Sequence, residues 1–141
     1  MSRWLLDTVV ISELRKAHRA DSHILAWHEK ISPRACYLSV ITLAEIRIGI
    51  RKVEKFDPVF AQRLESWYRN QILVHFKDRL LPVNQDVSEI AAELISQHNM
   101  TPFDAVIGAT ARNHELTLVT RNIAHFLNTE IAVIDPWEPI S

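Results

Sequence analysis

The stretch Trp4-Leu5-Leu6-Asp7, close to the start of the chain, contains the pattern on which the fold prediction rests. Three apolar residues followed by an acid predict a short buried strand, and the spacing over residues 9–17 predicts a helix directly after it. A strand followed at once by a helix is the first half of a unit in which the next strand lies parallel to the first.

The same order of a short apolar run and a helix recurs along the rest of the chain. Further strands are predicted over 36–39, 80–83, 116–119 and 131–134. Predicted helices cover 42–54, 57–76, 87–95 and 101–114, with another capped by Asp21 and a short turn or helix over 122–128. Pro82 cannot donate to a ladder, so the strand over 80–83 is expected at an edge. The alternation predicts an α/β fold with a central, mainly parallel five-stranded sheet and helices on both faces, in one domain over residues 1–141.

Length and composition agree with a globular protein of one domain. The chain has 141 residues, of which 48% are hydrophobic and 23% are charged, and its formal net charge is −1. A nearly neutral chain does not coat nucleic acid as a polycation does, so contact with nucleic acid would need a local basic patch. No apolar run is long enough for a signal peptide or a membrane span, which favours a cytoplasmic protein without membrane attachment.

Cysteine and glycine are scarce, and this excludes several kinds of site. Cys36 is the only cysteine, so neither a disulfide framework nor a cysteine-based zinc cluster can form. Gly49 and Gly108 are the only glycines. A P-loop needs two closely spaced glycines and the dinucleotide-binding motif needs three, so both nucleotide-binding motifs are excluded.

Three acidic residues are expected near the carboxyl ends of predicted strands. Asp7 ends the first strand, Glu45 lies in the first turns of the helix after the second strand, and Asp104 lies in the first turn of the helix before the fourth. Functional sites of parallel α/β sheets lie at this edge. A structural interpretation stays open, because Asp7 can cap a helix, and Thr42 with Glu45 or Thr101 with Asp104 can form capping boxes.

If the three carboxylates converge, a divalent cation would relieve their repulsion. Carboxylates within about 4–6 Å of one another raise each other's pKa. Oxygen ligands without cysteine or a suitably spaced histidine pair favour Mg²⁺ or Mn²⁺ over zinc. Such an ion keeps several waters and binds substrate phosphate, so the predicted chemistry is metal-assisted hydrolysis of a phosphodiester.

The sequence resembles the PIN-domain nucleases of the VapC/FitB toxin type over nearly its whole length. The matching stretches are Leu5-Leu6-Asp7-Thr8, Ser39-x-x-Thr42-x-Ala44-Glu45-x-x-x-Gly49, Phe103-Asp104-Ala105, Leu116-Thr117-Leu118-Val119-Thr120-Arg121-Asn122 and Asp135-Pro136-Trp137. The resemblance implies a three-layer α/β/α domain with Mg²⁺-dependent endoribonuclease activity, in which Asp7, Glu45 and Asp104 match the family's acidic positions. It also implies a toxin that forms a homodimer and is held inactive by a small VapB/FitA-like antitoxin, through which it meets promoter DNA.

The chain departs from the family at its fourth acidic position. Asn122 and His125 stand at the two places where the family has an aspartate, and neither is acidic. His125 could ligate Mn²⁺, protonate the leaving oxygen or be a solvated turn residue. Thr8, Thr120 and Asn122 are candidate supporting residues that could orient ligands or water.

Basic residues on the helix over 42–54 are candidates for binding RNA. Lys52 lies two turns beyond Glu45 on nearly the same face, and Arg47 and Arg51 form a neighbouring stripe. A solvated charged face is the alternative interpretation.

Two other functions are alternatives to the nuclease. The missing fourth acid favours a non-cutting module that binds its antitoxin and, with it, promoter DNA. A phosphatase with an aspartyl nucleophile usually needs a second aspartate two residues after the first, where this chain has Val9.

Overall fold

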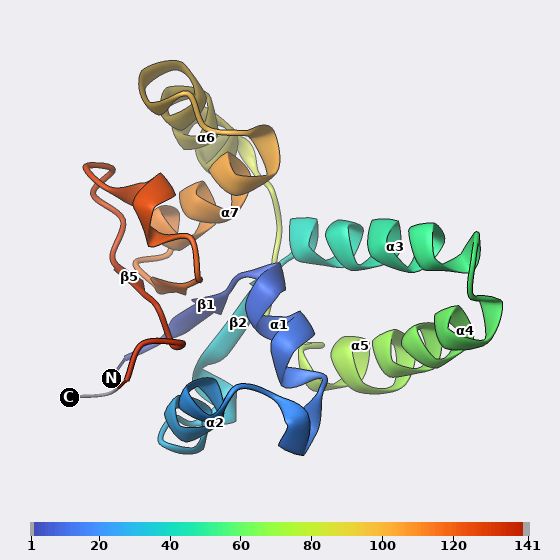
Figure 1. The fold of residues 1–141 in the computed structure, drawn as a ribbon. Helices are drawn as coiled ribbons and strands as arrows, with labels where there is room; N and C mark the ends of the chain where they lie inside the picture. The colour runs from blue at the N-terminus through green and yellow to red at the C-terminus, as the bar shows by residue number, and fades with distance from the viewer. Residues whose placement is uncertain (1, 140–141) are drawn as a thin grey trace.

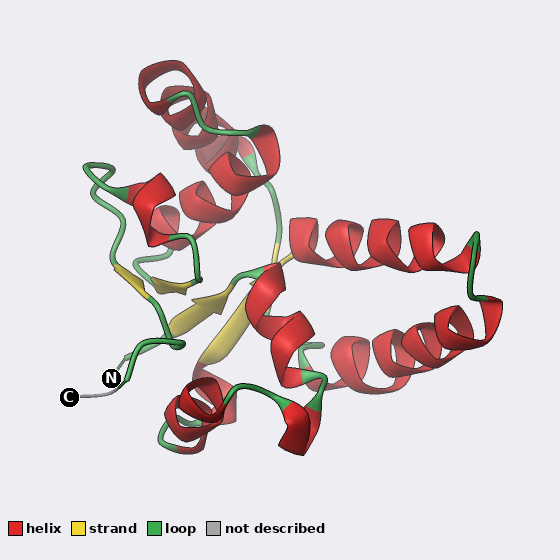
Figure 2. Cartoon of the chain, in the orientation of Figure 1, coloured by secondary structure: helices red, strands yellow, loops and turns green. Residues whose placement is uncertain are grey.

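A parallel sheet forms the centre of the protein, whose computed structural model describes residues 2–139. Within these residues, five strands pair in the order β3-β2-β1-β4-β5, and every pairing is parallel. The strands are β1 (Trp4–Leu6), β2 (Cys36–Ser39), β3 (Leu80–Leu81), β4 (Thr117–Val119) and β5 (Val133–Ile134). The predicted five-stranded parallel sheet is confirmed, as is the edge position of β3. Figure 2 shows these strands in yellow, surrounded by helices.

The first face of the sheet is covered by helices that precede β3 in the chain. These are α1 (Thr8–Leu14), α2 (Ser22–Glu29), α3 (Val40–Glu54), α4 (Pro58–Trp67) and α5 (Leu73–His75), with 3₁₀ turns at Ala17–Arg19 and Pro33–Ala35. Their apolar side chains pack with Leu6 and Leu38 in one core cluster. Helices α3 and α4 run side by side and extend away from the sheet as an arm (Figure 1).

The second face is covered by α6 (Gln85–His98) and α7 (Pro102–Asn113), which pack against each other. A second core cluster joins them to Leu5 and Leu118 of the sheet and to Phe126 of the 3₁₀ turn Ile123–Phe126. The sheet therefore lies between two helical layers, as the three-layer prediction requires. No helix within residues 2–139 has the length and apolar character needed to cross a membrane.

Helix α3 begins two residues earlier than predicted. The Ser39 side chain accepts a hydrogen bond from the backbone N–H of Ile41, so the helix starts at Val40. Glu45 therefore lies in the second turn, and the capping box predicted for Thr42 and Glu45 is wrong. A serine cap satisfies one of the unpaired N–H groups at the helix start, and apolar periodicity alone does not reveal this.

Two further local predictions are corrected. Thr101 precedes α7 but makes no side-chain capping bond, so the second predicted capping box is also wrong. The helix predicted over 57–76 is interrupted by a π-helical turn at Tyr68–Ile72, which separates α4 from α5. The turn places Tyr68 and Ile72 in the core. The α-helical period of apolar residues does not reveal this packing constraint.

Candidate active site

Asp7 follows the central strand β1 and caps α1. Its Oδ1 accepts a hydrogen bond from the backbone N–H of Thr8 at 2.8 Å, and its Oδ2 accepts one from Thr120 Oγ1 at 2.8 Å. Asp7 is only 9% exposed, and Thr120, which follows β4, is fully buried. Asp7 is predicted either as a helix cap or as an acid at the carboxyl edge of the sheet. Its side chain caps α1 and also lies at that edge, so the two interpretations are compatible.

Glu45 reaches the same edge from α3. Its Oε1 accepts a hydrogen bond of 2.6 Å from Thr8 Oγ1, which also lies 3.2 Å from Thr42 Oγ1. Thr42 is fully buried. Thr42 is predicted only as a cap, although its position three residues before Glu45 places the two side chains on one helix face.

Asp104 enters the site from the first turn of α7. Its Oδ2 lies 3.3 Å from Nδ1 of His125, and the two side chains are 27% and 55% exposed. Both residues line a hollow of 140 Å³ together with His98 and Thr101. His125 thus contacts a predicted metal ligand, and its role as a ligand, an acid or a solvated turn residue stays a prediction. The hollow and His98 had not been predicted, since they depend on how the α6–α7 loop packs.

The neighbouring acids affect the pKa values of Asp7 and Glu45. Burial raises the pKa of Asp7, the hydrogen bond from Thr120 opposes this, and repulsion from Asp104 adds to it. Burial also raises the pKa of Glu45, against the Thr8 hydrogen bond, and both Asp7 and Asp104 raise it further. A desolvated carboxylate near other carboxylates holds its proton more tightly, and a bound cation would reverse this.

Thr120 and Asn122 are brought to the site in different ways. The Thr120 hydroxyl donates to Asp7 and accepts a hydrogen bond of 3.1 Å from the backbone N–H of Asn122. Asn122 thus supports the site through its backbone N–H, although Asn122 as a whole is exposed to solvent. Both residues are predicted as supporting residues, and the sequence does not distinguish support by the backbone from support by the side chain.

The donor set fits a hard divalent cation chemically. Asp7, Glu45 and Asp104 supply carboxylate oxygens, and their repulsion is the penalty that Mg²⁺ or Mn²⁺ would relieve. Within residues 2–139, however, no group of three or more acidic, histidine or cysteine side chains stands close enough together to hold a metal ion as placed. Two of the carboxylates are instead turned to the Thr8 and Thr120 hydroxyls.

The predicted RNA-binding residues do not all have the same surroundings. Arg47 pairs with Glu65 of α4, and its guanidinium carbon lies 5.4 Å from the centre of the Tyr68 ring. Arg47 therefore has a packing role between α3 and α4. Arg51 and Lys52 are exposed, and their role in RNA binding stays a prediction.

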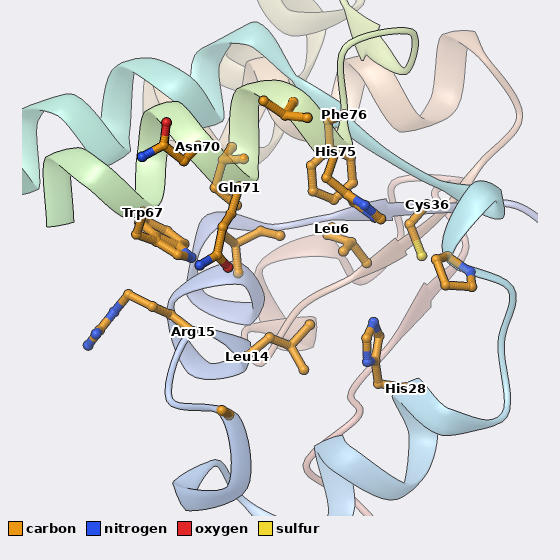
Figure 3. A pocket seen from close by; sticks show the side chains of 15 residues that line it. Leu6, Leu14, Arg15, His28, Cys36, Trp67, Asn70, Gln71, His75 and Phe76 are labelled. Carbon is orange, nitrogen blue, oxygen red and sulfur yellow. The ribbon is translucent and has the colours of Figure 1, made fainter. Parts of the chain in front are cut away.

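A hollow of 480 Å³ lies away from the three acids, between α1, α2 and the π-helical turn. Figure 3 shows the His28 and His75 side chains reaching into it from different elements, with Cys36 near them. Burial lowers the pKa of both imidazoles and raises that of the Cys36 thiol to about 11. A thiol with so high a pKa is protonated at neutral pH and is a poor nucleophile.

The fold and the acidic edge together define a class of protein, and comparison with known proteins agrees. The PIN domain family matches residues 4–130, and the chain belongs to this family. The chain is 35% identical over 140 residues to Toxin FitB of Neisseria gonorrhoeae, covering 94% of this chain and 97% of the relative. It is 36% identical over 142 residues to VapC ribonuclease Y4jK of Sinorhizobium fredii, covering 96% and 98%.

Solved structures show the same similarity. A chain in the structure of FitAB bound to IR36 DNA fragment matches with a TM-score of 0.87 and 31% identity, over 98% of both chains. A chain of FitAcB from Neisseria gonorrhoeae matches with a TM-score of 0.85 and 32% identity, over 96% of this chain and 99% of that one. The resemblance to VapC/FitB-type toxins is thereby confirmed.

Proposed function

We propose that this chain, as one PIN domain over residues 1–141, is a Mg²⁺- or Mn²⁺-dependent endoribonuclease and the toxin of a type II toxin–antitoxin pair. Asp7, Glu45 and Asp104 are the proposed metal ligands and catalytic residues. The observation that carries the proposal is that carboxylates from three separate elements act on one another electrostatically: Asp104 helps to raise the pKa of Asp7, and Asp7 and Asp104 help to raise the pKa of Glu45. The ribonuclease name of the Sinorhizobium relative supports RNA as the substrate.

Each side chain has a proposed task. When bound, a divalent ion would activate a water and neutralise charge on the scissile phosphate. Asp7 would hold the ion from the central strand, and the Thr120 hydroxyl would keep the Asp7 carboxylate in one orientation. Thr8 would do the same for Glu45. Outer partners of this kind typically change metal affinity or activity by about 10–100-fold when removed.

The proposed partners follow from the relatives. One matching chain is in FitAB bound to a DNA fragment. By this similarity we propose that a small FitA/VapB-like antitoxin binds this chain in the cytoplasm, joins it to promoter DNA and presents a basic side chain to the acids. A cation from the antitoxin would stabilise the acids in the way a metal does and would compete with it.

Cleavage of single-stranded RNA tests the proposal. We expect the wild type to cut RNA with Mg²⁺ or Mn²⁺ and to stop when a chelator is added. Asp104→Asn should lose at least about 10–100-fold in rate while keeping its circular dichroism spectrum, because the amide still fits a first-turn position. Asp86→Asn, in the first turn of α6, is the matched control and should cut normally. Wild-type turnover by Asp104→Asn would remove Asp104 from the site.

A non-cutting module is the second candidate function. It is favoured by one observation, namely that the neighbour of Asp104 is His125 rather than a fourth carboxylate. In that case the wild type binds antitoxin but leaves RNA intact with either metal, whereas His125→Asp acquires activity. Cleavage by the wild type excludes this candidate.

A further inference from the structure

A second hollow opens at the amino-terminal ends of β1 and β2, at the sheet edge opposite to the three acids. Its volume is 530 Å³, within the range of about 300–1,000 Å³ that is usual for small-molecule sites. We call it the amino-edge hollow. It is lined by Ser2, Arg3, Trp4, Lys30, Ile31, Ser32, Arg34, Ala35 and Tyr37.

The charge of the amino-edge hollow is entirely positive. Arg3, Lys30 and Arg34 line it, and no aspartate or glutamate does. Among the ion pairs found within residues 2–139, none includes any of these three cations. The chain as a whole carries a net charge of −1. Three cations without an acidic partner are therefore a local concentration of charge that suits an anionic ligand.

Aromatic side chains complete the amino-edge hollow. Trp4 and Tyr37 belong to adjacent strands and are partly exposed. Trp4 packs with the first core cluster and Tyr37 with the second, so the two rings border the hollow from opposite faces of the sheet. The Arg3 guanidinium is held in place, since Nη2 donates to the backbone oxygen of His114 at 3.1 Å and the guanidinium carbon lies 5.9 Å from the centre of the Tyr37 ring. A fixed cation beside an aromatic ring, here Arg3 beside Tyr37, combines a positive charge for a phosphate with a ring surface for a base.

We propose that the amino-edge hollow binds a nucleoside phosphate, either as a free nucleotide or as one unit of an RNA strand. Lys30 and Arg34 hold the phosphate by charge-assisted hydrogen bonds, and the base stacks against Trp4 or Tyr37. Arg3 supports the ring stack and adds positive charge. The site lies at the opposite edge of the sheet from Asp7, so its occupation does not depend on catalysis or on a metal.

Nuclear magnetic resonance titration of the full chain in the presence of a chelator tests the proposal. We expect adenosine monophosphate to shift the backbone amide signals of residues 30–32 and 34–37. Lys30→Ala combined with Arg34→Ala should weaken this binding at least about tenfold, because two charged phosphate contacts are lost. Exchanging the two cations, Lys30→Arg with Arg34→Lys, should preserve it. Arg63→Ala with Lys77→Ala removes two exposed cations elsewhere and is the matched control.

Adenosine and inorganic phosphate, as separate probes, should each bind at least about tenfold more weakly than the nucleotide, since each lacks half of the contacts. If a five-nucleotide RNA shifts the same signals and binds with higher affinity than the nucleotide, the natural ligand is RNA. If only the nucleotide binds, the natural ligand is a free nucleotide. Equal binding by the wild type and the double alanine variant would overturn the proposal, as would equal binding of inorganic phosphate and the nucleotide. Because no cleavage is measured, this test is independent of the proposed nuclease activity.

Discussion

Asp7 is a carboxylate that the protein buries although the neighbouring acid Asp104 repels it. Its partners are the Thr8 backbone and the Thr120 hydroxyl, and burial outweighs both in raising its pKa. A neutral side chain in place of the Asp7 carboxylate should therefore stabilise the protein, although the substitution removes a proposed metal ligand. A gain in stability on losing a functional group is typical of sites whose geometry serves function.

The first prediction concerns stability against pH. The folded pKa of Asp7 is raised above the unfolded value, so the folded state keeps a proton where the unfolded state has lost it, and the free energy of unfolding falls as pH rises through that interval. Asp7→Asn has no carboxyl group at this position, so its free energy of unfolding does not fall for this reason. Urea unfolding with a chelator should show Asp7→Asn more stable than the wild type at pH 7, with a smaller difference at pH 4. A difference independent of pH would contradict the assignment.

Addition of Mg²⁺ should make the wild type more stable than Asp7→Asn, which reverses their order of stability. A ligand that binds only the folded state at a hundredfold excess over its Kd stabilises by about 2.7 kcal/mol. We expect Mg²⁺ to stabilise the wild type in this way and to leave Asp7→Asn nearly unchanged. Asp86→Asn, which keeps all three acids, should respond to Mg²⁺ like the wild type.

The second prediction concerns His125, whose Nδ1 lies 3.3 Å from Asp104 Oδ2. His125→Asp places a fourth carboxylate beside Asp104, so we expect Mg²⁺ to bind at least about tenfold more tightly. His125→Ala should lower the preference for Mn²⁺ over Mg²⁺, because imidazole suits Mn²⁺ better. Isothermal titration with each metal measures both effects. Unchanged affinities in both variants would show that His125 takes no part in metal binding.

At the scale of elements, α7 determines where Asp104 and His125 meet. Gly108 lies on this helix, and a Cβ there would come within 2.8 Å of the Phe126 ring and 3.0 Å of the end of Ile131. The absence of a side chain allows α7 to pack directly on the turn that contains His125. Gly49 on α3 differs, because a Cβ there would meet nothing within 4 Å.

The third prediction compares these two glycines. Gly108→Ala should destabilise the protein by about 1–3 kcal/mol, since the buried Phe126 ring must move. Gly49→Ala should stabilise it by about 0.5–1 kcal/mol, because alanine favours a helix and finds free space. Urea unfolding of both variants measures the difference. Destabilisation by Gly49→Ala would show that the space beside it is needed for packing.

At the scale of the whole molecule, charge is divided between the two edges of the sheet. The carboxyl edge holds Asp7, Glu45 and Asp104, whereas cations gather at the amino edge. The α3–α4 arm also leaves apolar side chains in solvent, with Phe56 78% exposed and Val59 64% exposed. Exposed apolar groups near one another on a projecting arm favour association with another protein.

The fourth prediction is that the chain forms a homodimer. Burial of apolar surface from the arm would supply part of the driving force. Light scattering at micromolar concentration should give a mass twice the 16.3 kDa of one chain. A mass of one chain at that concentration would contradict the dimer.

The sequence alone determined the order of strands and helices and the parallel sheet, and it predicts a shared edge for the three acids. These features follow from local periodicity together with the rule that parallel strands end at one edge. The start of α3 at Val40 and the π-helical turn at Tyr68–Ile72 were not predicted, because a serine cap and a packing constraint override the simple period.

Only the tertiary structure decided which partners hold the acids. Thr120 donates to Asp7 across 113 residues of sequence, and Thr8 donates to Glu45 across 37. Such contacts depend on which strand lies beside β1 and on how each helix is rotated against the sheet. Periodicity identifies the face of a helix that is buried, but the neighbour that each side chain meets there is set by packing between elements that are distant in the chain.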